Sequence, residues 1–576
     1  MKKLNKKEIE ALLDEIKAKY YESSQFKNID RNEMYFMASS TLDTIFIQLL
    51  HSNIEEARNV IDVIYPPFRN AFREELVVFS NNPTKNQSIN LEVFDDVTFE
   101  AQKDIMYNLV QYNVIRNRLE AGYLEDIEIN YDEETKLIKT SQETKSALIA
   151  RYEDAEKYCY DRKSFMKKGS NLIVAYIMGC EQSYGLSILY DDYEIIQLLK
   201  EMHFPTRSTS LFFETNYKLY EKEIREIMKF AESDYNAKRD VTDNYNLSDF
   251  DLDDYKRIYC CLMTLCLNRT QFCFCESMRK RIIPTPNVIW HKDKIIEFIH
   301  FFTSINEEKI KYILETFLVF KNEFQYSCGR EYLSIYQPIF DFHDYYVINS
   351  SLTLITLAQR KLIWQINKTA DKNKNYENAI SLMAQDKEKI MISEILSFIS
   401  REPFNINNNF RFKATDKQNT DVEVDISILD SNQKILFLIE CKDHIPIDNE
   451  FERNRQDKLL ISESEYRAEK NKIILDNLKL YVNNAHSSSE LPEKVLSILI
   501  ANHYGGSNTE KAPIPIISKA TFFKLLKKHS YDLSMVYQSI IKKDYKPAGL
   551  KQEKLNTRFL DYTIESWVVN NKSIVL

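Results

Sequence analysis

The sequence predicts a multidomain protein, with a large all-α N-terminal region at residues 1–367 and a C-terminal α/β domain with a central mixed sheet at residues 376–535. Apolar residues recur at helical spacing through most of the first part, whereas residues 420–440 show strand-like patterns. At 576 residues the chain is also too long for one hydrophobic core. A basic C-terminal extension, residues 536–576, is expected to follow the α/β domain.

In the N-terminal region, helical spacing covers residues 7–21, 32–50, 53–65, 99–118 and 141–161. A hairpin is expected among these helices, because Ile127–Tyr131 and Lys136–Lys139 flank the acidic turn Asp132-Glu133-Glu134. Loops are expected at residues 80–90, 233–249 and 368–375. The region therefore forms either one domain or two subdomains divided near 233–249, and the polar segment 368–375 marks the boundary before the α/β domain.

Composition limits the class of protein. Only 8 Gly and 13 Pro occur, which favours long helices with few tight turns. The sequence shows no run of eighteen apolar residues and no signal peptide, so a soluble, cytoplasmic protein without a membrane segment is expected. It also shows neither a phosphate-binding P-loop nor a Gly-rich dinucleotide loop, so no NTP-driven motor is expected.

Five of the nine cysteines fall close together, at Cys260, Cys261, Cys266, Cys273 and Cys275. Their spacing lacks the paired CxxC pattern of a zinc site, and the next histidine downstream is His291. The surrounding segment is typical of a buried helix, in which free cysteine packs as a small apolar residue. We therefore expect core packing here.

The candidate site lies where a continuous apolar strand, Ile435–Ile439, runs into Glu440-Cys441-Lys442. Asp425 lies in the preceding strand-like segment, Val422–Ile428. If the two segments pair, Asp425 comes beside Glu440, and two neighbouring carboxylates favour a bound cation such as Mg²⁺. Two carboxylates and a lysine that orients or deprotonates a water describe a metal-dependent phosphodiesterase site.

This order of residues resembles the PD-(D/E)XK superfamily of restriction-endonuclease-like nucleases, although Val424 replaces the proline that precedes the aspartate. The resemblance covers roughly residues 380–530. It implies a preceding helix with an inward-facing acid, and residues 386–400 fit, with Glu394 as the first candidate and Glu388 as the second. It also implies a following helix, for which residues 450–482 fit, with Gln456 as a polar residue near the site. Two further strands are expected at residues 495–500 and 514–517.

The resemblance implies a role for each candidate residue. Asp425 and Glu440 would hold Mg²⁺ or Mn²⁺, and the backbone carbonyl of Cys441 is a further candidate ligand. Lys442 would position the attacking water, and Glu394 would assist directly or through water. The implied substrate is a nucleic-acid phosphodiester, with DNA preferred over RNA, and analogy alone points to bacterial genome-defence or mobile-element systems.

The charge is uneven. The whole chain carries −9, yet residues 381–576 hold 28 basic and 27 acidic side chains, against 49 and 59 in residues 1–380. Residues 511–558 hold 11 basic and 3 acidic side chains. The candidate phosphate-binding residues in this stretch are Lys524, Lys527, Lys528, Lys542 and Lys543. A solvated helix face is the alternative explanation for such a basic run. The acidic helical region is expected to bind a protein partner, to form a homo-oligomer or to gate the site.

Three alternatives to a DNA nuclease stay open. Asp425 and Glu440 could be solvent-facing positions of an antiparallel sheet, with Lys442 as their surface partner. The nuclease-like fold could be a catalytically inactive scaffold or interaction protein. A ribonuclease effector could use the same three residues.

Overall fold

In this computed structural model, the structure describes residues 1–23, 31–50, 96–125, 127–141, 216–238, 245–247, 249–280, 286–320, 337–342, 344–355, 375–400, 404–414, 421–443, 450–502, 511–543 and 552–569, with a few single positions between them. The chain divides into two compact units. Unit 1 contains Met1–Ala11, Asn117–Lys163 and Ser381–Leu576, and unit 2 contains Leu12–Arg116 and Ser164–Ile380. The expected helices at 53–65 and 141–161 and the loop at 80–90 lie outside the described residues.

The sequence pattern predicted an all-α region. Unit 2 is mainly helical, but it also contains a small β-sheet. Its helices are α2 (Arg31–Leu50), η4 (Tyr217–Tyr220), α11 (Glu221–Lys238), α12 (Leu252–Lys280), α13 (Lys292–Thr303), α14 (Glu307–Ile313), the π-helix η5 (Leu314–Leu318) and α15 (Ser350–Ile355). Strands β4 (Val288–His291), β5 (Ile339–Phe342) and β6 (Tyr345–Ile348) form a sheet in the order β4-β6-β5. Each strand has only four residues, too few to show a clear alternating pattern. The α11 helix also continues to Lys238, into the segment 233–249 expected to be a loop.

Four of the five clustered cysteines pack as expected, and the side chain of Cys275 lies outside the described residues. Cys260, Cys261, Cys266 and Cys273 are buried free thiols on α12. Burial raises the pKa of both Cys261 and Cys266 to about 12, so these thiols stay protonated and apolar in character.

A buried polar network also stabilises unit 2. Asp43 of α2 accepts hydrogen bonds from the backbone N–H groups of Ser350 and Ser351 at 2.8 Å, where α15 begins. Its carboxylate also accepts from the hydroxyl of Ser351 and the side-chain amide of Asn287. The donors join α2 to α15 and to the start of β4, so this carboxylate is a structural link within unit 2.

Unit 1 contains a five-stranded sheet built from both ends of the chain, in the order β1-β2-β3-β13-β12. Its strands are β1 (Lys2–Lys3), β2 (Ile129–Asp132), β3 (Leu137–Thr140), β12 (Gln552–Phe559) and β13 (Tyr562–Val569). The predicted hairpin is confirmed as β2–β3. The segment predicted as a basic C-terminal extension, 536–576, contains β12 and β13, and β13 pairs in parallel with β3. Local sequence patterns carry no information about a partner strand more than 400 residues away.

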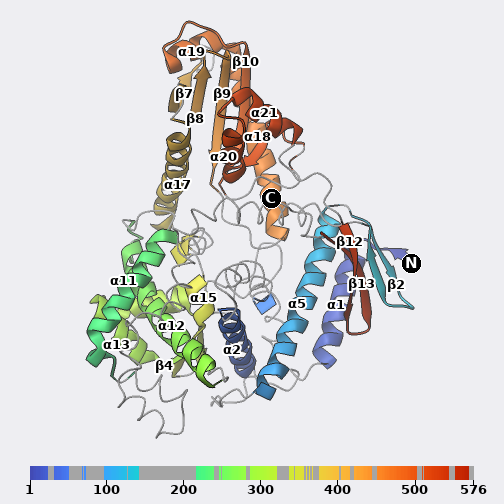
Figure 1. Cartoon of the computed structure of the whole chain (residues 1–576), viewed down its shortest axis with the longest axis vertical. Helices are drawn as coiled ribbons and strands as arrows, with labels where there is room; N and C mark the ends of the chain where they lie inside the picture. The colour runs from blue at the N-terminus through green and yellow to red at the C-terminus, as the bar shows by residue number, and fades with distance from the viewer. Residues whose placement is uncertain are drawn as a thin grey trace. The chain divides into compact units, whose positions relative to one another are not determined.

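The central sheet of unit 1 has the order β11-β10-β9-β8-β7, and Figure 1 shows β7, β8, β9 and β10 side by side. Its strands are β7 (Asn405–Lys413), β8 (Asp421–Asp430), β9 (Ile435–Lys442), β10 (Lys494–Ala501) and β11 (Ile516–Ser518). The pairs β7·β8 and β8·β9 are antiparallel, whereas β9·β10 and β10·β11 are parallel. The sheet is therefore mixed, as predicted.

Helices cover both faces of this sheet. The surrounding helices of unit 1 are α17 (Asn375–Ile399), α18 (Glu450–Asp476), α19 (Leu478–His486), α20 (Lys519–Lys528) and α21 (Leu533–Lys542). Residues of α17, α20 and α21 share one apolar cluster with the strands, and residues of α18 and α19 share another. Side chains of β9 alternate between the two clusters, which explains why Ile435–Ile439 has no polar position.

Two differences from the expected elements have local causes. The strand β7 was not predicted, because six of its nine residues are Asn or basic and many of its side chains are exposed at the edge of the sheet. The helix expected at 450–482 is divided at Asn477 into α18 and α19. Two further helices, α1 (Lys6–Ser23) and α5 (Asp96–Leu124), match the helices expected at 7–21 and 99–118. Within the described ranges, no helix is both long and apolar enough to cross a lipid bilayer.

The buried imidazole of His486 predicts an acid-sensitive fold. Its Nε2 contacts the hydroxyl of Ser427 at 2.7 Å, and burial lowers its pKa to about 4, below the usual 6.5. As pH falls from about 6.5 to 4, the unfolded chain binds a proton that the folded chain does not, so the free energy of unfolding should decrease by up to about 3 kcal/mol. His486→Gln should flatten this dependence in denaturant titrations followed by circular dichroism. A variant that loses stability as steeply as wild type over this range would contradict the assignment.

Candidate functional site

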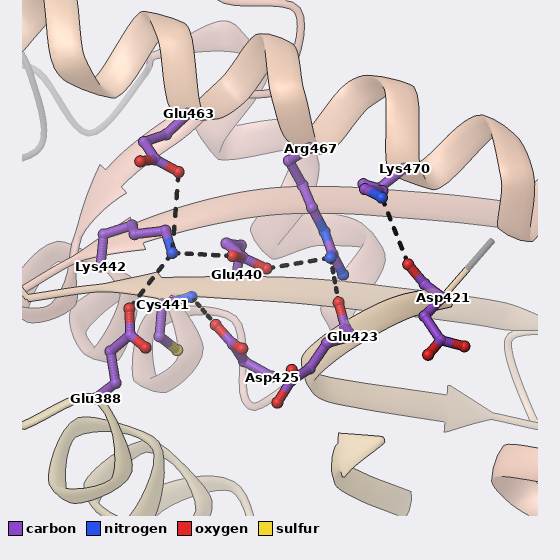
Figure 2. Close-up of polar contacts among 10 residues, drawn as sticks. All are labelled: Glu388, Asp421, Glu423, Asp425, Glu440, Cys441, Lys442, Glu463, Arg467 and Lys470. Atoms are coloured by element: carbon purple, nitrogen blue, oxygen red, sulfur yellow. Dashed lines mark hydrogen bonds and ion pairs between the residues drawn. The ribbon is translucent and has the colours of Figure 1, made fainter. Parts of the chain in front are cut away.

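The site forms where the β8–β9 ladder ends. The last paired residues are Ile426 and Ile439, so the next residues along the two strands, Asp425 and Glu440, come opposite one another. Beyond this point the backbone N–H of Cys441 donates to Oδ2 of Asp425 at 2.7 Å, as Figure 2 shows. The structure thus places the Asp425 carboxylate against the β9 backbone, next to Glu440.

The β8 strand twists at Asp425. Val422 and Val424 pack in the cluster on the α18–α19 face, whereas Ile426, at the same alternation, packs on the opposite face. Across from Asp425 on β7, Asn409 has a φ of 51°, a left-handed conformation that Asn tolerates. The local twist explains why pairing with β9 stops here. It also explains why the Asp425 side chain, in place of a backbone carbonyl, accepts the hydrogen bond from the Cys441 N–H.

Lys442 lies among carboxylates from three elements (Figure 2). Its Nζ is 3.2 Å from Oε1 of Glu440, 3.3 Å from Oε1 of Glu388 on α17 and 3.9 Å from Oε2 of Glu463 on α18. Burial lowers the pKa of Lys442, but the three carboxylates together outweigh burial and hold that pKa well above its usual range. Lys442 therefore stays protonated. As an ammonium it can orient a water or stabilise negative charge.

The second oxygen of Glu440 faces Arg467. The Nη1 atom of Arg467, on α18, lies 3.3 Å from Oε2 of Glu440, and the two side chains are 5% and 12% exposed. The same nitrogen donates to the backbone carbonyl of Glu423 on β8. Glu440 is thus held by one cation at each carboxylate oxygen.

The acids outnumber the bases in this cluster. Burial, and then the charge of Glu440, raises the pKa of Asp425 to about 7, although the Cys441 N–H and Lys442 oppose the rise. Burial likewise raises the pKa of Glu388. Four carboxylates face two cations, so the ionised cluster carries an excess charge of about −2. A divalent cation would neutralise that excess.

The donor set fits a hard cation. Asp425 and Glu440 supply carboxylate oxygens, and Oε2 of Glu440 is buried without a hydrogen bond in the part of the chain that the structure describes. Across those same residues, no set of three His, Cys, Asp or Glu side chains is arranged around one point. Mg²⁺ commonly binds through one or two carboxylates and keeps several waters, so two protein ligands are sufficient. Whether the Cys441 carbonyl contributes stays a prediction; its residue lies opposite Ile500 in the β9–β10 ladder.

The structure does not bring Glu394 to the site. Glu394 forms an ion pair with Lys519 of α20, whereas Glu388, the second candidate, reaches Lys442. The two glutamates are six residues apart, so they lie about 120° apart around the helix. Of the two, Glu388 is therefore the glutamate seen in contact with Lys442. The apolar spacing did not show which face of the helix points to the site. The reason is that α17, which begins at Asn375, has apolar residues on more than one face.

The five predicted phosphate-binding lysines do not form one group. Ser518 and Lys442 both align with Ala501, so α20 begins at the site edge of the sheet and carries Lys524, Lys527 and Lys528 away from it. Lys542 and Lys543 lie at the far end of α21, a helix about 15 Å long. Lys527 also stacks over the ring of Phe398 at 5.1 Å. Their contact with phosphates stays a prediction.

Sequence reasoning missed Glu463 and Arg467. Their i,i+4 spacing on α18 looks like an ordinary surface ion pair, and only the position of α18 over the strand ends shows otherwise. Gln456 lies earlier on α18, and its Nε2 is buried without a hydrogen bond within the described part of the chain. Comparisons with protein-family models, curated proteins and solved structures find no match to this chain.

Asp425→Asn should separate a cation site from a structural carboxylate. The amide keeps an oxygen for the Cys441 N–H but removes a charged metal ligand. Wild type at a Mn²⁺ concentration 100 times Kd should gain about 2.7 kcal/mol in unfolding free energy, and the variant should lose most of this gain. In chelator the variant should melt no lower than wild type, since the repulsion with Glu440 is removed.

Asp430→Asn is the matched control, because Asp430 lies at the other end of β8 and caps the turn through Asn432 and Gln433. It should keep the full Mn²⁺ shift. A wild-type protein that shows no shift, together with an Asp425→Asn variant that melts well below it in chelator, would make the carboxylate structural.

Proposed function

We propose that this protein is a metal-dependent nuclease that hydrolyses nucleic-acid phosphodiester bonds. The observation that carries the proposal is the placement of Asp425 opposite Glu440 at the end of a buried ladder, with Lys442 beside them. A mixed sheet covered by helices on both faces agrees with the restriction-endonuclease-like fold that we propose for the central part of unit 1. The choice of DNA over RNA rests on the sequence resemblance alone.

In this proposal Asp425 and Glu440 hold Mg²⁺ or Mn²⁺. When bound, such an ion supplies Lewis acidity and lowers the pKa of a coordinated water. The Lys442 ammonium orients the attacking water or a phosphate oxygen and stabilises the negative charge that develops on phosphorus oxygens. The water's proton would pass to a carboxylate of the cluster or to solvent. Glu388 and Glu463 hold the ammonium in place from two sides.

A catalytically inactive scaffold is the second candidate. Both oxygens of Glu440 already face cations, and Lys442 already contacts three carboxylates. Such a network can join α17 and α18 to the sheet without any chemistry. Incubating the pure protein with plasmid, single-stranded DNA or RNA, in Mg²⁺, Mn²⁺ or chelator, separates the DNA nuclease, the ribonuclease and the scaffold.

Lys442→Met should abolish cleavage while leaving Mn²⁺ affinity intact or increased. The substitution removes the ammonium but no metal ligand, and rate losses of about 100-fold or more are usual for such groups. Lys519→Met is a close control, since Lys519 is similarly buried and also pairs with a glutamate of α17. It should keep wild-type cleavage. Equal activity in wild type and Lys442→Met would contradict the proposed role.

The same design tests the two glutamates. Glu388→Gln should reduce cleavage, because Lys442 loses one of its closest partners, whereas Glu394→Gln should leave it unchanged. Single-turnover rates with each variant give the answer. A larger loss in Glu394→Gln would restore the original assignment of Glu394.

The predicted phosphate contacts are tested by salt dependence. Replacing Lys542 and Lys543 with Gln should weaken DNA binding and reduce the slope of log K against log salt by up to about 0.9 per contact. Replacing Lys524, Lys527 and Lys528 tests the other group separately. An unchanged slope in both variants would assign all five lysines to solvated helix faces.

A further inference from the structure

Arg467 of α18 contacts both strands of the site. It donates to the carbonyl of Glu423, two residues before Asp425 on β8, and its Nη1 lies 3.3 Å from Glu440 on β9. Its side chain is 5% exposed, so the guanidinium lies within the protein (Figure 2). A buried arginine is costly unless it is compensated, which makes these contacts informative.

These contacts lie beyond the last paired residues of β8 and β9. Regular pairing of β8 with β9 stops at Ile426 and Ile439, and the carboxylates lie just beyond. From there, the Cys441 N–H fixes Asp425 from the β9 backbone, and Arg467 fixes Glu440 relative to the β8 backbone. Asp425 of β8 is thus bonded to the backbone of β9, and Glu440 of β9 is linked through Arg467 to the backbone of β8. Without Arg467, Glu440 would keep its ion pair with Lys442 on its own strand but would lose this link to the β8 backbone.

Both partners also have spare bonding capacity. Oε2 of Glu440 and Nη2 of Arg467 are buried and make no hydrogen bond within the described residues. Oε2 therefore keeps a lone pair that is not used by a hydrogen bond, although its charge is compensated by the nearby guanidinium. This is the state expected of a carboxylate that is oriented before it receives a ligand.

We infer that Arg467 is a positioning residue that sets Glu440 relative to Asp425 for binding a divalent cation. The inference rests on the proposed function, because it assigns Arg467 a role in that same site. Charge and positioning predict opposite effects on cation affinity. Loss of a neighbouring positive charge alone would strengthen cation binding, whereas loss of the oriented carboxylate weakens it.

The experiment measures Mn²⁺ binding to the full chain by calorimetry, without substrate, for four proteins. They are wild type, Arg467→Met, Arg467→Lys and Lys470→Met. Met keeps the apolar stem of Arg467, and Lys keeps its charge but loses the planar fork. Lys470 is the matched control, since it lies three residues further on α18 and also donates to a β8 carbonyl, that of Asp421, at 3.4 Å. Melting temperatures in chelator report folding for each variant.

Arg467→Met is expected to raise the Mn²⁺ Kd about tenfold or more, Arg467→Lys to raise it less, and Lys470→Met to leave it unchanged. Tighter binding by Arg467→Met, or a lower melting temperature with an unchanged Kd, would overturn the inference while leaving the nuclease proposal intact. Absence of Mn²⁺ binding by wild type would overturn both. If Arg467→Met does not fold, a wild-type Kd in Arg467→Lys overturns the inference and a raised Kd supports it.

Discussion

The antiparallel ladder between β8 and β9 fixes the rest of the site. Its register places Ile426 against Ile439 in the core beneath α17, α20 and α21, and a slip by one residue would turn those side chains to the other face. The apolar core therefore determines that Asp425 comes opposite Glu440. The position of the polar site therefore follows from the register of the apolar residues. The strand twist at Asp425 changes only the final hydrogen bond, which the Asp425 side chain accepts.

Placing the two acids together has an electrostatic cost, which three different groups offset. The Cys441 N–H bonds to Asp425, Lys442 contacts one oxygen of Glu440, and Arg467 contacts the other. Lys442 also reaches glutamates on α17 and on α18, helices that cover opposite faces of the sheet. The same interactions that compensate the acids therefore hold the helical layers at the strand ends, so site geometry and local stability depend on one network.

Much of the site could be predicted from sequence because it follows a strong local pattern. The apolar run before Glu440 and the alternation around Asp425 identify two buried strands without any knowledge of their partners. The strand β7 could not be found in this way, since its edge position leaves Asn and basic side chains exposed. Pairing of β13 with β3 joins segments far apart in sequence, which local periodicity does not record. Arg467 could not be identified either, because its role depends on where α18 crosses the strands.

The balance of charge bears on the choice between a scaffold and a catalyst. A network that serves only to join helices to a sheet is most stable when its charges cancel, because every uncompensated buried charge is destabilising. Here Lys442 and Arg467 compensate two of four carboxylates. Asp425, which among the described residues accepts a hydrogen bond from a neutral N–H, is the least compensated of the buried ones. Burial, and then the charge of Glu440, raises the pKa of Asp425 to about 7. A chain that keeps such a carboxylate beside Glu440 gives up stability that an asparagine would restore, and binding a divalent cation is the physical gain that would offset it.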